Sequence, residues 1–287
     1  MRTAVVTIAA HRDTHLRLQL RSLERSTSVP NAHVVVAIGD PAVADVVSAE
    51  GSTAAVLWIE HDRGPLPLAR ARNAGAAAAL AAGAELLIFL DVDCIAGPAM
   101  IRRYADVARR QCHRSALLCG PVTYLPPPGP GGYDLDHVHE ARRPHSARPA
   151  PPAGTVVPGA DYDLFWSLSF AVTADTWNRI GGFCTDYTGY GGEDTDFAYT
   201  AAAAGVGLRW VGGADAFHQY HPVSDPPVEH LRDILVNSRL FERRWGRWPM
   251  QGWLRAFEDR GLITYDPAQG YRLRSTDSGH EYEGRAL

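Results

Sequence analysis

The first hundred residues alternate short apolar runs with segments of helical character, and this alternation constrains the fold more than any other feature. Val34–Ile38 and Leu86–Leu90 are continuously apolar, as expected for strands that are buried on both faces. Helical segments between such strands favour a parallel sheet covered by helices, so the sequence predicts an α/β fold. The predicted elements are, in order, Ala4–Ala9, Leu16–Arg25, His33–Ile38, Ala55–Ile59, Leu68–Ala82 and Leu86–Leu90.

The composition excludes several function classes. All 28 basic residues are arginines, so no lysine is available for a Schiff base or a phosphate-binding loop. They stand against 32 acidic residues, and the formal net charge of -4 argues against a protein that binds nucleic acid unaided. The cysteines form no Cys-x-x-Cys pair, so we expect reduced thiols in a cytoplasmic protein. They are Cys94, Cys112, Cys119 and Cys184.

No segment of the sequence predicts passage through a membrane. The apolar stretch Ala4–Ala10 is too short for a signal-peptide core, and the charged residues His-Arg-Asp follow it. The apolar segment Ala74–Leu90 is interrupted by two glycines and a glutamate. We therefore expect a cytoplasmic protein without a transmembrane segment, while a peripheral contact with the inner face of the membrane and the oligomeric state stay open.

Two later segments differ in composition from the rest. Residues 126–160 are rich in proline and are expected to form a long mobile loop, because proline opposes both helix and central strand.

Apolar residues from Leu231 to Trp248 follow a mostly helical spacing and alternate with arginines. This pattern is typical of a helix that packs its aromatic side on the domain; a basic face for phosphate, membrane or a partner is the alternative. Thr276–Leu287 lack any apolar period and are expected to be frayed.

Two aspartates follow the apolar strand Leu86–Leu90. Asp91 and Asp93 are two residues apart on an extended segment, so their side chains point to the same side. Since the ends of parallel strands meet at one edge of a sheet, Asp40 would lie at the same rim. Carboxylates together with substrate phosphates are typical ligands of Mg²⁺ and Mn²⁺. A turn cap ahead of Pro98 explains the same aspartates equally well.

A second acidic group precedes a helical stretch. In Gly191-Gly-Glu-Asp-Thr-Asp196, a helix would begin at Asp194, and Glu193 and Asp194 would face the space above the sheet. Helix capping explains one acid well, but it does not require three acids within four residues beside paired glycines. The position at a helix N-terminus is expected to lower the pKa of Asp194.

Histidines and an arginine complete the candidate residues. His218 and His221 are three residues apart in Phe217-His-Gln-Tyr-His221, and imidazole is a common ligand for borderline metals. The spacing leaves open which of the two is the ligand. Arg72 lies near the start of an alanine-rich helix, which is a natural place for a diphosphate.

The joint order of these motifs resembles family 2 glycosyltransferases of the GT-A fold. The matching segments are Ala71-Arg-Asn-Ala-Gly75, Leu87-Ile-Phe-Leu-Asp-Val-Asp93, Gly191-Gly-Glu-Asp-Thr-Asp196 and the histidine of Phe217-His-Gln. The Gly-Gly-Glu-Asp block is also similar to the galactosyltransferase and chondroitin-polymerase branches. The resemblance implies one Rossmann-like GT-A domain over residues 1–225, with a nucleotide-sugar half (1–95) and an acceptor half (96–225). Residues 226–287 would be a C-terminal helical extension and tail.

The resemblance also implies roles for single residues. Asp93 and a histidine, best matched by His218, would bind Mn²⁺ or Mg²⁺, with Asp91 beside the ribose or the metal. Asp194 would take the acceptor proton, and Glu193 would hold the acceptor. Candidate residues for the nucleotide-sugar site are Thr7, Ala9, Asp40, Arg72, Asp91 and Trp166.

These roles predict a metal-dependent inverting glycosyltransferase, because one base opposite the leaving group inverts the anomeric carbon. We expect a UDP-sugar as donor, with a GDP-sugar as the alternative, and a glycan or small-molecule acceptor. An apolar strand that ends in Asp-x-Asp also resembles the haloacid-dehalogenase phosphatases, although these have the motif near the N-terminus and use a later lysine. A catalytically inactive GT-A-like binding protein is the third interpretation.

Overall fold

The computed structural model of the chain describes residues 1–274. Its elements are, in order, β1 (Thr3–Ala9), α1 (Asp13–Glu24), β2 (Ala32–Ile38), α2 (Ala42–Ala49), β3 (Ala55–Ile59), α3 (Leu68–Ala81), β4 (Leu86–Leu90), β5 (Cys94–Ala96), α4 (Met100–Ala108), α5 (Gln111–Arg114), β6 (Ala116–Cys119), β7 (Val122–Tyr124), η1 (Val138–Ala141), β8 (Val156–Gly159), η2 (Tyr162–Leu164), β9 (Ser169–Thr173), α6 (Ala174–Ile180), α7 (Glu193–Ala203), β10 (Gly207–Val211), β11 (Ala216–His218), η3 (Val228–His230), α8 (Leu231–Trp245), α9 (Gln251–Asp259), β12 (Ile263–Asp266) and β13 (Gly270–Leu273).

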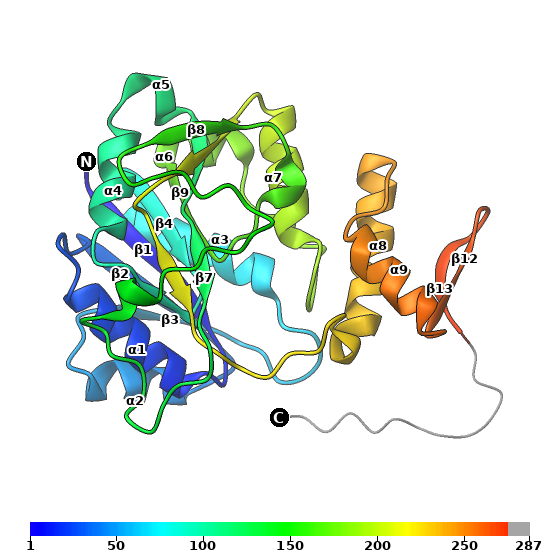
Figure 1. Cartoon of the computed structure of the whole chain (residues 1–287), viewed down its shortest axis with the longest axis horizontal. Coiled ribbons are helices and arrows are strands. Elements are labelled where there is room, and N and C mark those ends of the chain that lie inside the picture. The colour runs from blue at the N-terminus through cyan, green and yellow to red at the C-terminus, as the bar shows by residue number, and fades with distance from the viewer. Residues whose placement is uncertain (275–287) are drawn as a thin grey trace.

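Eight strands form the central sheet, in the order β3-β2-β1-β4-β9-β6-β10-β8 (Figure 1). Strands β1 to β4 run parallel, β9 is antiparallel to both β4 and β6, and β8 is antiparallel to β10. A smaller sheet, β5-β11-β7, stands beside it. The predicted α/β class with a mostly parallel sheet is therefore confirmed.

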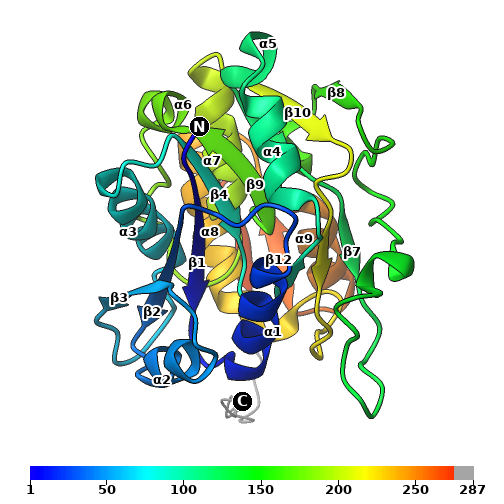
Figure 2. The same ribbon diagram turned by 90° about the vertical axis from the view of Figure 1, so that its left-hand side faces the viewer.

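Successive residues of the buried strands serve opposite faces of the sheet, as the two-residue period of a strand requires. Val6 and Phe89 pack in the cluster that α3, α6 and α7 cover, whereas Val5 and Ile88 pack against α4. Helices α1 and α2 cover the β2 side of that second face, where Leu20 meets Val35. Figure 2 shows α3 on one side of the sheet and α1 and α4 on the other.

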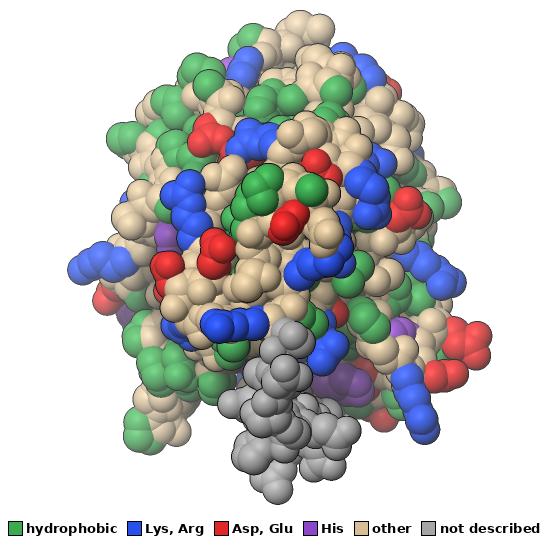
Figure 3. All heavy atoms as spheres, turned by 90° about the vertical axis from the view of Figure 1, so that its right-hand side faces the viewer, with side chains coloured by type: hydrophobic (Ala, Val, Ile, Leu, Met, Phe, Trp, Pro, Cys, Tyr) green, Lys and Arg blue, Asp and Glu red, His purple; other side chains and the backbone are tan. Residues whose placement is uncertain are grey.

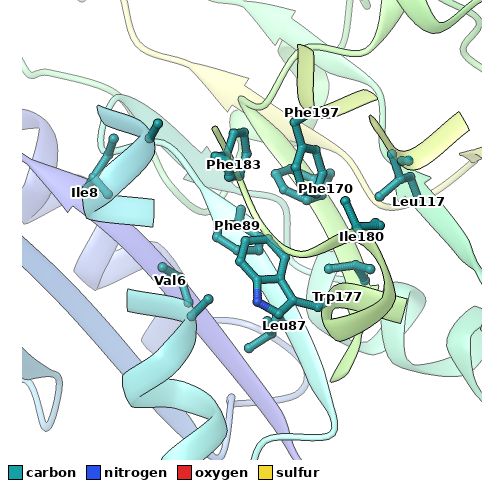
Figure 4. Close-up of a cluster of buried hydrophobic side chains, with 14 of the residues drawn as sticks. Val6, Ile8, Leu87, Phe89, Leu117, Phe170, Trp177, Ile180, Phe183 and Phe197 are labelled. Carbon is teal, nitrogen blue, oxygen red and sulfur yellow. The ribbon is translucent and has the colours of Figure 1, made fainter. Parts of the chain in front are cut away.

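Aromatic stacking fixes the junction between the parallel half and the rest of the sheet. Phe89 of β4 and Phe170 of β9 stack at 4.6 Å between ring centroids, and Phe183 stacks on Phe197 of α7 at 4.2 Å (Figure 4). Trp177 of α6 lies 5.1 Å from Phe89. Because α7 begins with the Glu-Asp pair, this cluster sets where those acids stand relative to β4.

All elements predicted in the first hundred residues are present, but α2 and β5 were not expected. The Asp40 side chain accepts a hydrogen bond of 3.1 Å from the N–H of Ala42, the first residue of α2. Asp40 therefore stabilises the turn into this short helix in addition to lying at the sheet rim.

The prediction of a loop throughout 126–160 is wrong at its C-terminal end. Val156–Gly159 forms β8, which pairs with β10 at the edge of the central sheet. Pro158 is compatible with this strand because an edge strand does not need every N–H in the ladder. The segment also contains the short helix η1. After this segment, Ser169–Thr173 forms β9, between β4 and β6.

The C-terminal extension is not only helical. Helix α8 confirms the predicted pattern and ends at Gly246, whose φ of 66° is the left-handed conformation that favours glycine. Helix α9 and the hairpin β12–β13 follow, and neither was predicted. Arginine and acidic side chains are interspersed on the face that carries these elements (Figure 3). The expectation for Thr276–Leu287 lies outside the described residues.

The aromatic side of α8 packs on the domain, as the first of the two interpretations expected. Phe241 is fully buried, and Trp245 Nε1 donates a hydrogen bond of 2.7 Å to Asp196 Oδ1 in α7. Arg244 Nε donates to the same oxygen at 2.7 Å, and Asp196 itself has no exposed surface. Within residues 1–274, no helix has the length and apolar character needed to cross a membrane.

A substitution at Gly75 tests how closely α3 approaches the central sheet. A Cβ atom at Gly75 would lie 2.5 Å from Val6 Cγ1 and 2.9 Å from Val36 Cγ2, so Gly75→Ala must displace strand side chains. We expect it to lower the free energy of unfolding by about 1–3 kcal/mol, measured by urea titration. Gly252→Ala in α9 is the matched control, because nothing lies within 4 Å of its Cβ position. Equal stability of the two variants would contradict this packing.

Candidate active site

Three potential metal ligands meet beyond the end of β4. His218 Nε2 lies 3.3 Å and His221 Nε2 lies 3.5 Å from Asp93 Oδ2. One ligand atom from each of the three residues falls within 4.8 Å of the others. One carboxylate and two imidazoles form a donor set that suits a divalent first-row transition metal, a class that includes Mn²⁺. The sequence left the choice of histidine open, and the structure brings both to Asp93.

Local pairing explains how these residues meet. His218 is the last residue of β11, which pairs with β5 directly after Asp93, so that His218 faces Cys94 in the register. Gln219 N donates a hydrogen bond of 2.7 Å to the Asp93 carbonyl oxygen, and Leu125 N donates to the His218 carbonyl oxygen at 2.8 Å. The backbone therefore holds the cluster without help from the side chains that would bind a metal.

Asp93 and the histidines beside it stabilise each other's charged forms. Burial alone would raise the pKa of Asp93, but the hydrogen bonds and charges of His218 and His221 outweigh it and hold that pKa far below its usual range. Burial would lower the pKa of His218, and Asp93 reverses the direction of the shift. An ionised carboxylate is the form that binds a cation.

Asp91 has a different partner from Asp93. Its Oδ1 lies 3.1 Å from Arg72 Nη2, and Arg72 Nη1 lies 3.2 Å from Glu193 Oε1. Arg72 is 4% exposed, so its charge is held in the protein interior between the two acids. Burial would lower the pKa of Arg72, but the charges of Asp91 and Glu193 raise it. Asp91 does not belong to the three-residue cluster, and the structure offers no support for it as a metal ligand.

Helix α7 begins at Glu193, one residue before the start predicted at Asp194. Gly191 and Gly192 have φ values of 91° and 90°, which bring the chain sharply into the helix. Glu193 is 7% exposed, and its Oε2 has no hydrogen-bond partner among residues 1–274. Asp194 is half-buried, and its Oδ1 accepts a hydrogen bond of 2.7 Å from Thr195 N.

The expected lowering of the Asp194 pKa is wrong in direction. Burial raises the pKa of Asp194 by more than Arg72 and the backbone N–H groups lower it. Burial also raises the pKa of Glu193 to about 7, and the charge of Asp194 adds to that shift. Desolvation therefore outweighs the helix dipole at this position.

One of the six candidate residues for the nucleotide-sugar site, Asp40, lines a hollow of about 400 Å³. Asp40 lies in its wall, where Oδ2 accepts a hydrogen bond of 2.6 Å from His11 N. Thr7 and Ala9 are buried, and Thr7 Oγ1 donates to Gln19 Oε1 at 2.8 Å, so neither side chain faces the hollow's opening. The other residues that line the hollow were not among the candidates from the sequence. They lie between the end of β1 and the first turn of α1, or at the start of α2. The lining is His11, Arg12, Asp13, Thr14, His15, Asp40 and Ala42.

Trp166 ends an aromatic row that starts at the metal cluster. Tyr124 stacks on His218 at 4.6 Å, His145 lies 5.6 Å from Tyr124, and Trp166 lies 5.0 Å from His145. The guanidinium of Arg148 lies 5.1 Å over the Trp166 ring. Trp166 therefore reaches the metal cluster through His145 and Tyr124, and it does not line the hollow beside Asp40.

Comparisons with known proteins agree on the kind of domain. The family model described as the N-terminal domain of galactosyltransferase matches residues 156–222, which include Glu193, Asp194, His218 and His221. The validoxylamine A glucosyltransferase of Streptomyces hygroscopicus subsp. limoneus is 29% identical, with 84% of this chain and 56% of the relative covered. That of subsp. jinggangensis is 28% identical, with coverages of 84% and 60%. The chain therefore spans little more than half the length of these relatives.

Solved structures share the fold at low sequence identity. Staphylococcus aureus TarS has a TM-score of 0.56 and 13% identity, with 84% of this chain and 64% of TarS covered. The mannosyltransferase PcManGT from Pyrobaculum calidifontis, solved with GDP-Man and Mn²⁺, has a TM-score of 0.52, 17% identity and coverages of 86% and 66%. GalNAc-T7, solved with UDP, GalNAc and Mn²⁺, has a TM-score of 0.53, 14% identity and coverages of 91% and 57%. The fold is that of GT-A glycosyltransferases, and the relatives that match the sequence are named as glucosyltransferases.

Two histidine variants test the metal cluster. Since both imidazoles lie beside Asp93, we expect His218→Ala and His221→Ala each to weaken apparent Mn²⁺ affinity by about one to two orders of magnitude. Mn²⁺ titration followed by electron paramagnetic resonance measures this. His137→Ala is the control, because His137 pairs with Asp134 at 2.8 Å on the exposed surface. Full affinity in His221→Ala would remove that residue from the site.

The pKa of Glu193 predicts a dependence of stability on pH. Its folded value of about 7 lies above the ordinary 4.5, so the folded state binds this proton more tightly than the unfolded state. Stability is therefore lost as pH rises from about 4.5 to 7. Glu193→Gln should melt about 5 °C above the wild type at pH 8, and the difference should vanish near pH 4.5. Glu140→Gln, on the exposed surface of η1, should show no such pattern; a lower melting temperature of Glu193→Gln at pH 8 would refute the shift.

Proposed function

We propose that this glycosyltransferase domain moves a sugar from a nucleotide diphosphate sugar to an acceptor hydroxyl, with a divalent cation, and inverts the anomeric carbon. A UDP-sugar is the favoured donor and a GDP-sugar the alternative, since neighbours of the same fold were solved with UDP-GlcNAc and GDP-Man. We also propose membership of family 2, with the Gly-Gly-Glu-Asp block as its acceptor-side motif. The phosphatase interpretation gains no support from the fold or the comparisons.

The observation that carries this proposal is the connection between two acidic groups by one arginine. Asp91 and Asp93 stand at the end of β4, and Glu193 and Asp194 stand at the start of α7. Arg72 contacts Asp91 and Glu193 at once, so it fixes the distance between the donor side and the acceptor side. Inverting transfer requires such a layout, with the leaving group and the base on opposite sides of the reacting carbon.

The donor set fits the metal that the proposal needs. Asp93, His218 and His221 would hold Mn²⁺ or Mg²⁺, and the bound cation would neutralise charge on the leaving diphosphate. Arg72 is buried and shared between two acids, so its role is to orient Asp91 and Glu193 and to add positive potential near the diphosphate. Asp40 and the hollow beside it would receive the nucleoside.

Asp194 completes the reaction as the base. The acceptor oxygen forms a bond to the anomeric carbon while the bond from that carbon to the phosphate oxygen breaks, and the leaving nucleoside diphosphate takes the electron pair. The acceptor proton passes to the Asp194 carboxylate. The raised pKa of Asp194 makes it a stronger base than an ordinary aspartate, which helps this step.

The acceptor is proposed to be a small hydroxyl-rich molecule. Both curated relatives are named for validoxylamine A, and this chain matches them over 84% of its length. A glycan acceptor is the alternative. A panel of UDP- and GDP-sugars, assayed with Mn²⁺ and validoxylamine A, tests the proposal, and the anomeric configuration of the product tests inversion.

Two isosteric variants separate the roles of the acids. Asp194→Asn should lower transfer by about 10²–10⁴, the range of a positioned base, while donor and Mn²⁺ still bind. Glu193→Gln should instead raise the acceptor KM. Asp175→Asn is the matched control, because Asp175 is an exposed acid in the first turn of α6.

Other outcomes would change the roles proposed for Glu193 and Asp194. Near-normal kcat in Asp194→Asn with loss of kcat in Glu193→Gln would exchange the two roles. Normal activity in both variants would remove the block from the mechanism. If no nucleotide sugar is turned over but the nucleotides bind, the inactive binding protein becomes the better description.

A further inference from the structure

Helix α1 carries a glutamine in the interior of the protein. Gln19 has no exposed surface, although an amide side chain is usually buried only where its polar atoms find partners. Its Nε2 donates hydrogen bonds of 2.6 Å to the Asp91 carbonyl oxygen and 3.2 Å to the Cys94 carbonyl oxygen. Its Oε1 accepts a bond of 2.8 Å from Thr7 Oγ1. Gln19 therefore binds both ends of the turn that carries Asp93 and holds this turn on α1.

A second glutamine connects α1 to the strand that supplies the histidines. Gln219 is 2% exposed, and its Nε2 donates a hydrogen bond of 3.0 Å to the His15 carbonyl oxygen. Its backbone N–H donates to the Asp93 carbonyl oxygen at 2.7 Å, and it directly follows His218. The His15 ring lies 6.2 Å from the His221 ring. One residue thus joins the first turn of α1, the turn after β4 and the end of β11.

The same turn of α1 lines the hollow beside Asp40. His15 lies in the hollow's wall together with the residues that lead into the helix, His11 to Thr14. Residues 11–14 are exposed, and no side chain among the described residues caps the N-terminus of α1, so this end of the helix is free to fray. A ligand in the hollow would order this turn, and the bond from Gln219 would carry that order to the metal cluster.

Packing along α1 supports both strands that flank the metal ligands. Leu18 packs on a buried cluster that contains Ile95 of β5 and Phe217 of β11. Ser22 Oγ accepts a hydrogen bond of 2.9 Å from Ala96 N, at the last residue of β5. Since both strands rest on the same helix, a shift of α1 reaches the metal cluster through the backbone as well as through the two glutamines.

We propose that α1 couples the hollow to the metal cluster, with Gln19 and Gln219 as positioning residues, so that a nucleoside in the hollow strengthens the binding of a divalent cation without any phosphate between them. The inference rests on the proposed function, which places the nucleoside in the hollow. Two ligands that favour the same arrangement of one element strengthen each other's binding by the same factor. Without this coupling, only the diphosphate would connect the donor to the cation.

Nucleosides that lack phosphate test the coupling independently of turnover. Mn²⁺ titration followed by electron paramagnetic resonance gives the apparent Kd of the cation with and without excess uridine or guanosine. Isothermal titration calorimetry gives the nucleoside Kd with and without Mn²⁺. In the wild type, the nucleoside that binds should lower the apparent Mn²⁺ Kd by about five- to tenfold, and Mn²⁺ should lower the nucleoside Kd by the same factor.

Two methionine variants remove the amide groups and keep the length of the side chain. Gln219→Met loses the bond to His15, and Gln19→Met loses the bonds to the turn after β4, so each should reduce the coupling factor to below about twofold. Mn²⁺ alone and nucleoside alone should still bind. A role confined to stability would lower the melting temperature and leave the coupling factor unchanged. Gln111→Met on α5 is the matched control, because Gln111 is exposed.

The outcomes separate this inference from the proposed function. A coupling factor near one in the wild type, or an unchanged factor in Gln219→Met, would overturn the role of α1. Gln219→Met decides the question if Gln19→Met does not fold, because the Gln219 side chain makes a single hydrogen bond among residues 1–274. Failure of both nucleosides to bind would refute the inference together with the nucleoside site of the proposed function.

Turnover assays complete the separation. Coupling that depends on the glutamines, with no turnover of any nucleotide sugar, would support the inference and refute the proposed function. Turnover of a nucleotide sugar by a wild type that shows no coupling would refute the inference alone.

Discussion

The buried guanidinium of Arg72 is the interaction on which the arrangement of the site depends. Four carboxylates from β4 and α7 converge above the sheet, and water is largely excluded from them. Arg72 contacts one acid of each pair and also lies 5.4 Å over the ring of Phe183, which belongs to the core cluster under α7. A buried charge is stable only when it is paired, so loss of Arg72 would leave two buried acids uncompensated and would be strongly destabilising.

The local features of the site could be predicted from the sequence because each has a short-range signal. Asp91 and Asp93 follow a run of five buried apolar residues, and the acids before a helical stretch with glycine on both sides define the start of α7. The pairing of Arg72 with Glu193 had no such signal, since 121 residues separate them. The role of both histidines likewise depends on the pairing of β11 with β5, which no local pattern encodes.

Where the prediction failed, a tertiary effect outweighed a local rule. Pro158 opposes a central strand, but β8 lies at the sheet edge, where the rule does not apply. The helix N-terminus favours an ionised Asp194, but the position of α7 over the aromatic core removes enough water to reverse the shift. The hairpin β12–β13 has strands of only four residues, too short for an alternating pattern to stand out from the helices before it.

The bonds from Arg244 and Trp245 to Asp196 couple the C-terminal segment to the acid block. Asp196 lies one helical turn or less from Glu193 and Asp194, so whatever orders the start of α7 also orders the end of α8. By thermodynamic linkage, a molecule bound at Glu193 and Asp194 must make the opening of α8 less favourable by the same free energy with which α8 favours that molecule's binding. Amide hydrogen exchange in the last turns of α8 is thus a reporter of occupancy at Glu193 and Asp194.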